Sequence, residues 1–144
     1  MRKKEQNNLT APSPRRFTLP KSQILRGRRN FQRLFASSEF INTPTITLRF
    51  ASFLTPDEDF KIGFISPKKI GNAVQRNRCK RLMREAYRLN RHVISDQLST
   101  RNDVIHAVFI ARKSDLDFHS VEKDIVTLLT ELRSQLLSTN LDEL

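Results

Sequence analysis

The sequence predicts an α+β protein, a two-layer α/β sandwich in which helices pack on one sheet. Three short runs have the residue types or the alternation of strands, and three longer stretches repeat apolar residues with helical spacing. Their order is helix, strand, strand, helix, strand, helix, with a further short strand either before Thr43 or split from the neighbouring pair. With 144 residues, the chain has the size of a single domain with one core. We divide it into a disordered basic arm at 1–16, a single domain at 17–138 and a flexible tip at 139–144.

The first predicted helix covers Ser22–Ala36. Gly27 weakens its first half, so the regular part is expected to begin near Arg28. Phe31 and Phe35 are four residues apart and therefore share one side of the helix. Two aromatic side chains at this spacing are typical of a core, but beside arginines they also suit the stacking of unpaired bases. The residues alone leave both uses open.

Two strands are predicted next. Thr43–Phe53 alternates apolar and polar residues, which is the pattern of a half-buried strand. Phe60–Ser66 follows it after a short polar, acidic turn. Such turns typically join antiparallel neighbours, so the two strands are expected to form a hairpin.

The C-terminal third is expected to be mostly structural. After a polar connection at Ser95–Asn102, the run Asp103–Ala111 is the most β-prone in the chain and predicts a central strand that is buried on both faces. The last helix is expected from Asp117 or Phe118 to Leu137. Its apolar stripe contains Val121, Ile125, Leu128, Leu129, Leu132 and Leu136.

The stretch Gly71–Arg91, between the second and third strands, predicts an amphipathic helix with Asn72 as its candidate N-cap. At about 100° per residue, basic side chains occupy one third of its circumference and apolar side chains occupy another. The basic third contains Arg76, Lys80, Arg84, Arg88 and Arg91, with Arg81 at its edge. The apolar third contains Cys79, Leu82, Met83, Ala86 and Leu89. One side therefore suits a core and the other suits a polyanion.

The basic side of this helix suits a nucleic acid better than it suits a solvated surface or an anionic membrane. Seven of the sixteen residues from Arg76 to Arg91 are Lys or Arg, and only Glu85 opposes them, so like charges one turn apart repel each other. A phosphate backbone converts that cost into binding through the release of counterions. The net charge is +15 over residues 1–91 and −4 over residues 92–144, which favours a binding surface in the first two thirds.

The sequence shows no catalytic or metal-binding motif. It has only three glycines and no Gly-rich phosphate loop, and its single cysteine, Cys79, belongs to the apolar side of the helix. The acidic run at 57–59 is interpreted as a polar turn and not as a metal site. No apolar run approaches the roughly 20 residues of a membrane span, and the N-terminus lacks the apolar segment of a secretory signal. We therefore expect a cytoplasmic protein with no membrane partner, whose role in any enzyme is that of a binding subunit.

The centre of the chain resembles a known family. Gly63-Phe64-Ile65-Ser66 is followed by Lys68-Lys69-Ile70-Gly71-Asn72-Ala73-Val74, and then by Arg76-Asn77-Arg78 and Lys80-Arg81-Leu82-Met83-Arg84-Glu85-Ala86. These runs strongly resemble the bacterial ribonuclease P protein subunit, whose signature is Arg-Asn-Arg followed by Lys-Arg and Arg-Glu. The runs Asn30–Phe35 and Asp103–Arg112 agree with it, so the resemblance covers roughly Leu19–Leu137.

The resemblance implies a ribonucleoprotein endonuclease that removes the 5′ leader from precursor tRNA. A large catalytic RNA would hold the Mg²⁺ ions and perform the chemistry, while the protein would improve substrate binding and metal affinity without needing a protein partner. The family fold also has a left-handed βαβ crossover through the basic helix, opposite to the hand that general rules favour. The alternative from another class is a structural RNA-binding module such as a ribosomal protein. A reader of duplex DNA ranks lower because no dimerisation heptads or helix-turn-helix spacing appear.

The resemblance also implies two sets of binding residues and no catalytic residue in the protein. The leader would lie in a cleft formed by Phe31, Phe35 and Arg49. Arg49 stands where the family often has an aromatic residue, which suggests a phosphate or cation–π contact in place of stacking. Contacts to the catalytic RNA would fall on Lys68, Lys69, Asn72, Arg76, Asn77, Arg78, Lys80, Arg81, Arg84 and Arg88.

Overall fold

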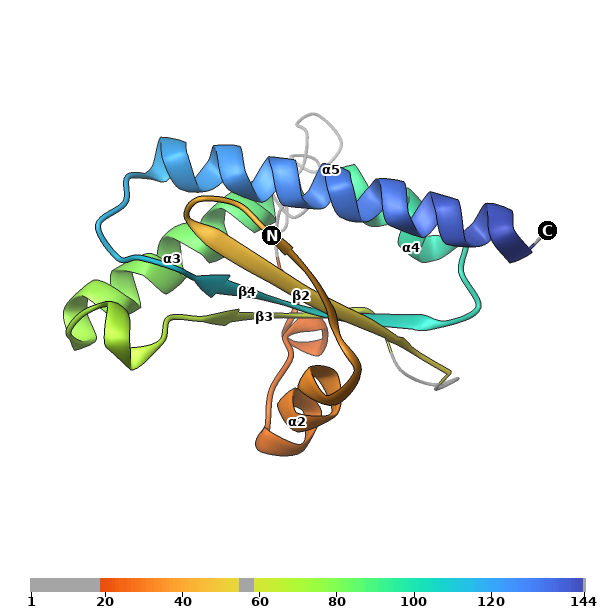
Figure 1. Cartoon of the computed structure of the whole chain (residues 1–144), viewed down its shortest axis with the longest axis horizontal. Coiled ribbons are helices and arrows are strands. Elements are labelled where there is room, and N and C mark those ends of the chain that lie inside the picture. The colour runs from red at the N-terminus through yellow and green to blue at the C-terminus, as the bar shows by residue number, and fades with distance from the viewer. Residues whose placement is uncertain (1–18, 55–58, 144) are drawn as a thin grey trace, which may run out of the picture.

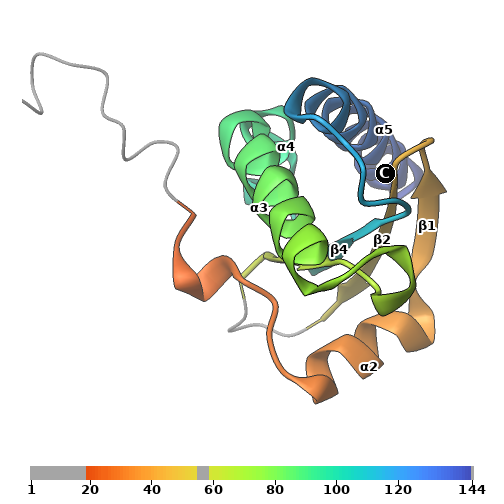
Figure 2. The same ribbon diagram turned by 90° about the vertical axis from the view of Figure 1, so that its left-hand side faces the viewer.

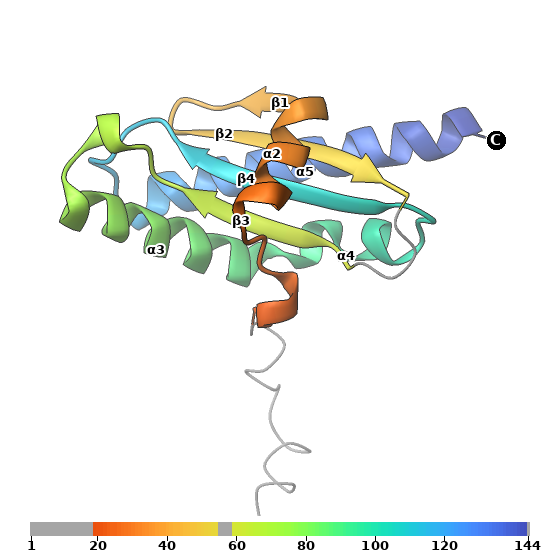
Figure 3. The same ribbon diagram turned by 90° about the horizontal axis from the view of Figure 1, so that it is seen from below.

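The fold is built on one four-stranded sheet. The computed structural model describes residues 19–54 and 59–143, so the predicted basic arm at 1–16 lies outside the described residues. The strands are β1 (Glu39–Asn42), β2 (Ile46–Phe53), β3 (Lys61–Ile65) and β4 (Val104–Ala111), in the spatial order β1-β2-β4-β3. β2 is antiparallel to both β1 and β4, whereas β3 and β4 are parallel (Figure 3).

The predicted hairpin between the second and third strands is wrong, because β4 lies between β2 and β3. All eight residues of β2 pair with β4, from Ile46 opposite Ala111 to Phe53 opposite Val104. β4 is almost wholly apolar and residues 105–109 are buried, so its central position removes most of its apolar surface from water. The prediction of a buried central strand is thus confirmed. β1 is the further short strand that was expected before Thr43.

The parallel pairing of β3 and β4 makes α3 (Ala73–Asn90) a crossover connection between them. In Figure 3 both strands point the same way, β4 lies above β3, and α3 lies on the far side of the sheet. Seen from the side of α3 with the strands pointing upward, β4 is therefore to the left of β3. The crossover is left-handed, as in the family fold, and this hand is rare among βαβ units.

Helices cover both faces of the sheet (Figures 1 and 2). α3, α4 (His92–Ser99) and α5 (Phe118–Glu143) lie on one face, and α2 (Arg28–Ser37) crosses the other. The predicted α+β sandwich is confirmed, and α2 adds a short helix on the second face. No helix within the described ranges is both long enough and apolar enough to cross a membrane.

The first regular helix begins late, as its glycine indicates. Lys21–Gln23 form a short 3-10 turn, Ile24 makes a parallel bridge to Ile62 of β3, and α2 begins only at Arg28. Gly27 has a φ of 90°, in the region that favours glycine, and it is there that the chain turns from the extended segment into the helix.

The predicted polar connection at Ser95–Asn102 is largely helical. α4 begins at His92, directly after α3, and packs on α5. Ile94 is fully buried, and Val93 and Leu98 pack against the same core. Because Ile94 and Leu98 are one helical turn apart, a short apolar stripe holds this segment on the body although its composition is polar.

The last helix begins where predicted and ends later. The Asp117 carboxylate accepts a hydrogen bond from the Ser120 N–H at 2.9 Å, and hydrogen bonds from Ser120 lower the pKa of the Asp117 carboxyl. α5 continues to Glu143, past the predicted end at Leu137, and the flexibility expected for 139–144 stays a prediction. The expected stripe is buried, with Val121, Ile125, Leu128, Leu129, Leu132 and Leu136 in the core.

The two faces of the sheet carry separate hydrophobic clusters. The larger cluster fills the space between the sheet and the helices α3, α4 and α5, with Leu48, Phe109 and Leu129 among its fully buried members. The smaller cluster lies under α2 and consists of Leu25, Leu34, Ala51 and Val108. Partly buried apolar residues border this smaller cluster, so the face under α2 is only partly closed to water.

A buried polar contact ties the turn between β1 and β2 to α5. The Asp124 side chain is buried, and its Oδ2 accepts hydrogen bonds from the Thr45 N–H, at 3.1 Å, and from the Thr45 hydroxyl. Arg112, directly after β4, donates from Nη1 to the Thr43 carbonyl at 2.6 Å. The turn at this edge of the sheet is therefore held by both α5 and the end of β4.

We predict that Asp124→Ala lowers the free energy of unfolding by about 1–3 kcal/mol, because the Thr45 N–H loses its acceptor while it stays buried. Urea titration followed by circular dichroism measures the change. Glu131→Ala is the control, since Glu131 is exposed on the same helix. Equal shifts of the two variants would contradict the structural role of Asp124.

Candidate nucleic-acid interface

The basic helix α3 has a well-defined start. The Gln75 N–H donates to Asn72 Oδ1 at 2.9 Å, and the Asn72 N–H donates to Gln75 Oε1 at the same distance. This reciprocal pair is a capping box, and it satisfies two backbone donors that a helix N-terminus otherwise leaves without partners. The predicted N-cap is confirmed, and the cap fixes the direction in which the helix leaves the preceding loop.

The loop before α3 is held against the body of the protein. Lys68 and Lys69 are exposed in a short 3-10 turn, and the Ile70 carbonyl that ends this turn accepts a hydrogen bond from the Ser114 hydroxyl at 2.6 Å. A Cβ atom on Gly71 would lie 2.5 Å from Gln75 Oε1 and 3.0 Å from Ser114 Oγ. Only glycine leaves room for both contacts, so the two lysines have a fixed position beside the first turn of the helix.

Four of the five residues predicted for the apolar side of α3 pack against the core, whereas Leu89 is half-buried and outside both hydrophobic clusters. Cys79, Met83 and Ala86 are fully buried, and Leu82 packs against the same cluster. Tyr87 was not among the predicted core positions, yet it is buried against Phe109, with ring centroids 6.0 Å apart. Burial raises the pKa of the Cys79 thiol and of the Tyr87 hydroxyl, so both groups are neutral at physiological pH. Cys79 is therefore a small core residue.

The basic side of α3 faces solvent. Arg76 and Lys80 are half-buried and Arg84 is exposed, so these three cations form a row along the helix at one-turn spacing. Arg76 Nε donates to the Asn72 carbonyl at 3.3 Å, and the Arg84 guanidinium lies 5.6 Å from the centre of the Phe64 ring. These contacts orient two of the three side chains. The predicted basic row is thus present as one continuous surface.

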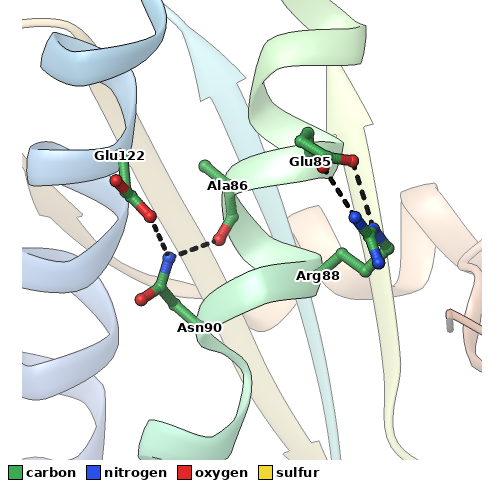
Figure 4. A network of polar contacts seen from close by, with 5 residues as sticks. All are labelled: Glu85, Ala86, Arg88, Asn90 and Glu122. Carbon is green, nitrogen blue, oxygen red and sulfur yellow. Dashed lines mark hydrogen bonds and ion pairs between the residues drawn. The ribbon is translucent and has the colours of Figure 1, made fainter. Parts of the chain in front are cut away.

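The C-terminal end of α3 carries different contacts (Figure 4). Arg88 donates to both Glu85 oxygens, at 3.1 and 2.6 Å, and this pairing lowers the pKa of the Glu85 carboxyl. Asn90 donates to the Ala86 carbonyl at 2.8 Å and to Glu122 Oε2, on α5, at 2.9 Å. Glu85 is the one acidic residue of the helix. Its charge is paired with Arg88 and not with Arg76, Lys80 or Arg84.

Arg78, one of the predicted RNA contacts, also makes a contact within the protein. Its Nη1 donates to the Leu116 carbonyl, in the loop before α5, at 2.7 Å. This direction follows from the position of Arg78 next to the buried Cys79, at the edge of the apolar side. Asn77, Arg78 and Arg81 are all exposed, so the RNA contacts proposed for them stay predictions. The structure therefore assigns Arg78 a contact within the protein that the sequence did not reveal.

The N-terminal segment reaches the basic side of α3, which helical periodicity did not reveal. Leu19 lies beside Arg81 and Arg84 in a surface pocket of about 450 Å³ that also includes Glu85 and Arg88. Leu19 also packs against the main core. The signal in the sequence was the pair of apolar residues Phe17 and Leu19 after a polar stretch. Leu19, the first described residue, thus lies next to the basic row.

Phe31 and Phe35 are on the other face of the sheet, and they differ in burial. Their ring centroids are 6.3 Å apart. The Phe31 ring is half-buried against β3, where a Cβ atom on Gly63 would lie 3.2 Å from it. Phe35 is 40% exposed. Phe31 therefore serves the core in part, whereas Phe35 offers its ring to solvent.

Arg49 lies beside this pair on β2. Its guanidinium carbon is 5.7 Å from the centre of the Phe35 ring, and its Nη1 donates to the Ser38 hydroxyl at 3.0 Å. The structure thus brings Phe31, Phe35 and Arg49 together on one surface. The cation–π contact that the sequence suggested for Arg49 is made within the protein itself.

The described residues contain no cluster of candidate metal ligands. Among residues 19–54 and 59–143, no three His, Cys, Asp or Glu side chains are grouped as a metal site requires. The positive charge of this surface comes from arginine and lysine. Such a surface can bind an anionic polymer.

Comparison with known proteins agrees with this arrangement. Residues 19–133 match the family model described as Ribonuclease P. The ribonuclease P protein component of Geotalea uraniireducens (strain Rf4) is 33% identical over 120 residues, which cover 82% of this chain and 97% of the relative. That of Porphyromonas gingivalis (strain ATCC 33277) is 32% identical over 132 residues, which cover 90% of this chain and 96% of the relative.

Solved structures agree with the fold. The RNase P protein from Thermotoga maritima matches with a TM-score of 0.60 at 27% identity, over 75% of this chain and 96% of that protein. The RNase P protein of Staphylococcus aureus matches with a TM-score of 0.63 at 22% identity, over 78% of this chain and 97% of that protein, and supports the fold alone. Since the match to the family model and to full-length relatives spans the sheet, the capped basic helix and the aromatic pair, this chain belongs to the family of bacterial ribonuclease P protein components.

Proposed function

We propose that this protein is the protein subunit of a ribonuclease P holoenzyme, which removes the 5′ leader of precursor tRNA, and that an RNA subunit performs the chemistry. The observation that carries the proposal is the row of Arg76, Lys80 and Arg84 on a helix whose start is fixed by a capping box. Membership of the family supports the substrate and the reaction. The proposed place of action is the cytoplasm.

The basic row is suited to a structured RNA because repulsion within it is relieved by phosphate. Cations one helical turn apart destabilise an isolated helix. Here the helix is held in place by its buried side and by Asn90, so the row keeps its spacing without a partner. An RNA backbone that contacts the row releases its condensed counterions, which favours binding. Lys68, Lys69 and Asn72 extend the same surface into the loop before the helix.

The leader of the substrate is assigned to the opposite face of the sheet. Phe31 and Phe35 offer aromatic rings and Arg49 offers a cation, which are the groups that single-stranded RNA requires. α3 and α2 cover opposite faces of the sheet, so the two RNAs would contact different sides of the protein. The Mg²⁺ ions would be held by the RNA subunit and the substrate.

We predict that Arg76→Ala/Lys80→Ala weakens assembly with the catalytic RNA. The slope of log K, the association constant, against the logarithm of the salt concentration should become shallower by about 1.5, as expected for two lost phosphate contacts. Binding is measured by filter retention at several salt concentrations. Cleavage of precursor tRNA at low Mg²⁺ should lose most of the stimulation that the wild-type protein gives. Lys123→Ala/Arg133→Ala is the control, because it removes the same charge from exposed positions on α5.

Two results would contradict the proposal in different ways. If the wild-type protein binds RNA tightly but does not stimulate 5′ cleavage, the protein is a general RNA-binding module such as a ribosomal protein. If the control variant loses as much affinity for the catalytic RNA as Arg76→Ala/Lys80→Ala, assembly is driven by the net charge of the protein and not by the surface of α3.

We predict that Phe35→Ala weakens holoenzyme binding of precursor tRNA by about 5- to 150-fold, because stacking of one base contributes about 1–3 kcal/mol. Binding of mature tRNA, which has no leader, should stay unchanged. Affinities for the two RNAs are measured side by side. Leu54→Ala is the control, since Leu54 is an exposed apolar residue elsewhere, at 85% exposure. An equal loss for both RNAs would refute the assignment of this surface to the leader.

A further inference from the structure

The aromatic surface continues beyond Phe35 to a residue that neither the sequence nor the family assignment singles out. Phe40, on β1, is 58% exposed. Its ring centre lies 5.4 Å from the guanidinium carbon of Arg49. Phe40 and Arg49 are directly opposite each other in the register of β1 and β2, so both side chains lie on the face that carries α2.

Arg49 therefore lies within cation–π distance of two aromatic rings. Its guanidinium carbon is 5.7 Å from the centre of Phe35 and 5.4 Å from that of Phe40, and the Ser38 hydroxyl accepts a hydrogen bond from it. Together with Phe31, these side chains form what we call the aromatic track: Phe31, Phe35, Arg49 and Phe40. Neighbouring groups along the track are 5.4 to 6.3 Å apart. Proteins that bind single strands present aromatic side chains of this kind, on which successive bases stack.

The track lies on one side of α2 only. On the other side, the Arg33 guanidinium covers the Phe53 ring at 3.8 Å from its centre. The Arg33 guanidinium therefore covers one face of the Phe53 ring. Phe35 and Phe40, in contrast, keep much of their ring surface in solvent. An isolated exposed aromatic residue is common on protein surfaces. Here, in contrast, two exposed rings, Phe35 and Phe40, contact the same arginine, Arg49, which Ser38 holds in place. We call this arrangement a stacking platform.

We propose that Phe40 is a further stacking residue for the 5′ leader, and that Arg49 holds the strand between Phe35 and Phe40. This inference rests on the proposed function, since it takes the ligand to be the unpaired leader. The exposed ring of Phe40 binds the face of one base, and the Arg49 guanidinium neutralises the adjoining phosphate while it stacks on the rings. Stacking tolerates any base, so the platform selects for length and not for sequence.

The sheet order decides which nucleotide Phe40 contacts. β1 and β3 are the two edges of the sheet, and α3 packs over β3 and β4. If α3 holds the catalytic RNA, the β3 edge is nearer the cleavage site. A leader that crosses the sheet from β3 therefore meets Phe31 first and Phe40 last. Phe40 is assigned to the bound nucleotide furthest from the cleavage site.

The test uses the reconstituted holoenzyme and a series of precursor tRNAs whose leaders grow by one nucleotide at a time. Wild type and Phe40→Ala should bind short leaders equally. Beyond a threshold length, wild type should gain about five-fold or more in affinity, and Phe40→Ala should lack this last gain. Phe40→Trp should retain it, and Leu54→Ala should behave as wild type. Melting temperatures of all variants establish that each is folded.

A second measurement separates stacking from a structural role. An abasic nucleotide at the threshold position should lower wild-type affinity and leave Phe40→Ala unchanged, because no base is left to stack. Arg49→Lys should lose part of the same gain, since lysine keeps the charge but not the planar contact with two rings. If Phe40 acts only on the fold, the abasic nucleotide affects both proteins equally.

The remaining outcomes distinguish this inference from the proposed function. If Phe35→Ala loses leader affinity while Phe40→Ala loses none at any length, the platform ends at Phe35 and the inference is overturned. A loss by Phe40→Ala that is uniform over all leader lengths overturns it as well. If neither variant affects leader binding, the assignment of this face to the leader fails.

Discussion

The parallel pairing of β3 with β4 is the constraint on which the rest of the structure depends. Parallel neighbours need a crossover, and the crossover here is α3, so the sheet itself decides where the basic helix lies. The same helix must bury Cys79, Met83 and Ala86 to close the core, which turns its cations outward. Core formation and display of the basic row are therefore one event. A change that loosens the core displaces the binding surface too.

Features with local causes could be predicted from the sequence. The cap at Asn72 and the two sides of α3 follow from residue spacing within one helix, and the burial of β4 follows from its composition. The order of the strands has no local cause, because each of β2, β3 and β4 could pair with either of the other two. The short acidic turn suggested a hairpin, but the more apolar β4 takes the central position between β2 and β3. α4 was missed because its apolar stripe is short.

The same distinction between local and long-range causes applies to the candidate site. Periodicity located the basic row, but it could not reveal the hydrogen bond from Arg78 to the Leu116 carbonyl, because the two residues are distant in the sequence. The same holds for Leu19, whose contact with the basic side depends on how the N-terminal segment crosses the fold. The spacing of Phe31 and Phe35 also did not decide between packing in the core and stacking on unpaired bases. The structure separates them, since Gly63 admits the ring of Phe31 into the sheet while Phe35 stays exposed.

The position of β4 in the chain has a consequence for synthesis on the ribosome. β4 is the centre of the sheet but begins only at Val104, and its partners begin at Ile46 and Lys61. Long-range pairings of this kind form slowly, and here they cannot form before β4 has emerged from the exit tunnel. Until then the apolar side of α3 has no sheet to cover. The nascent chain thus passes through a stage in which its cationic helix is complete and its core is not.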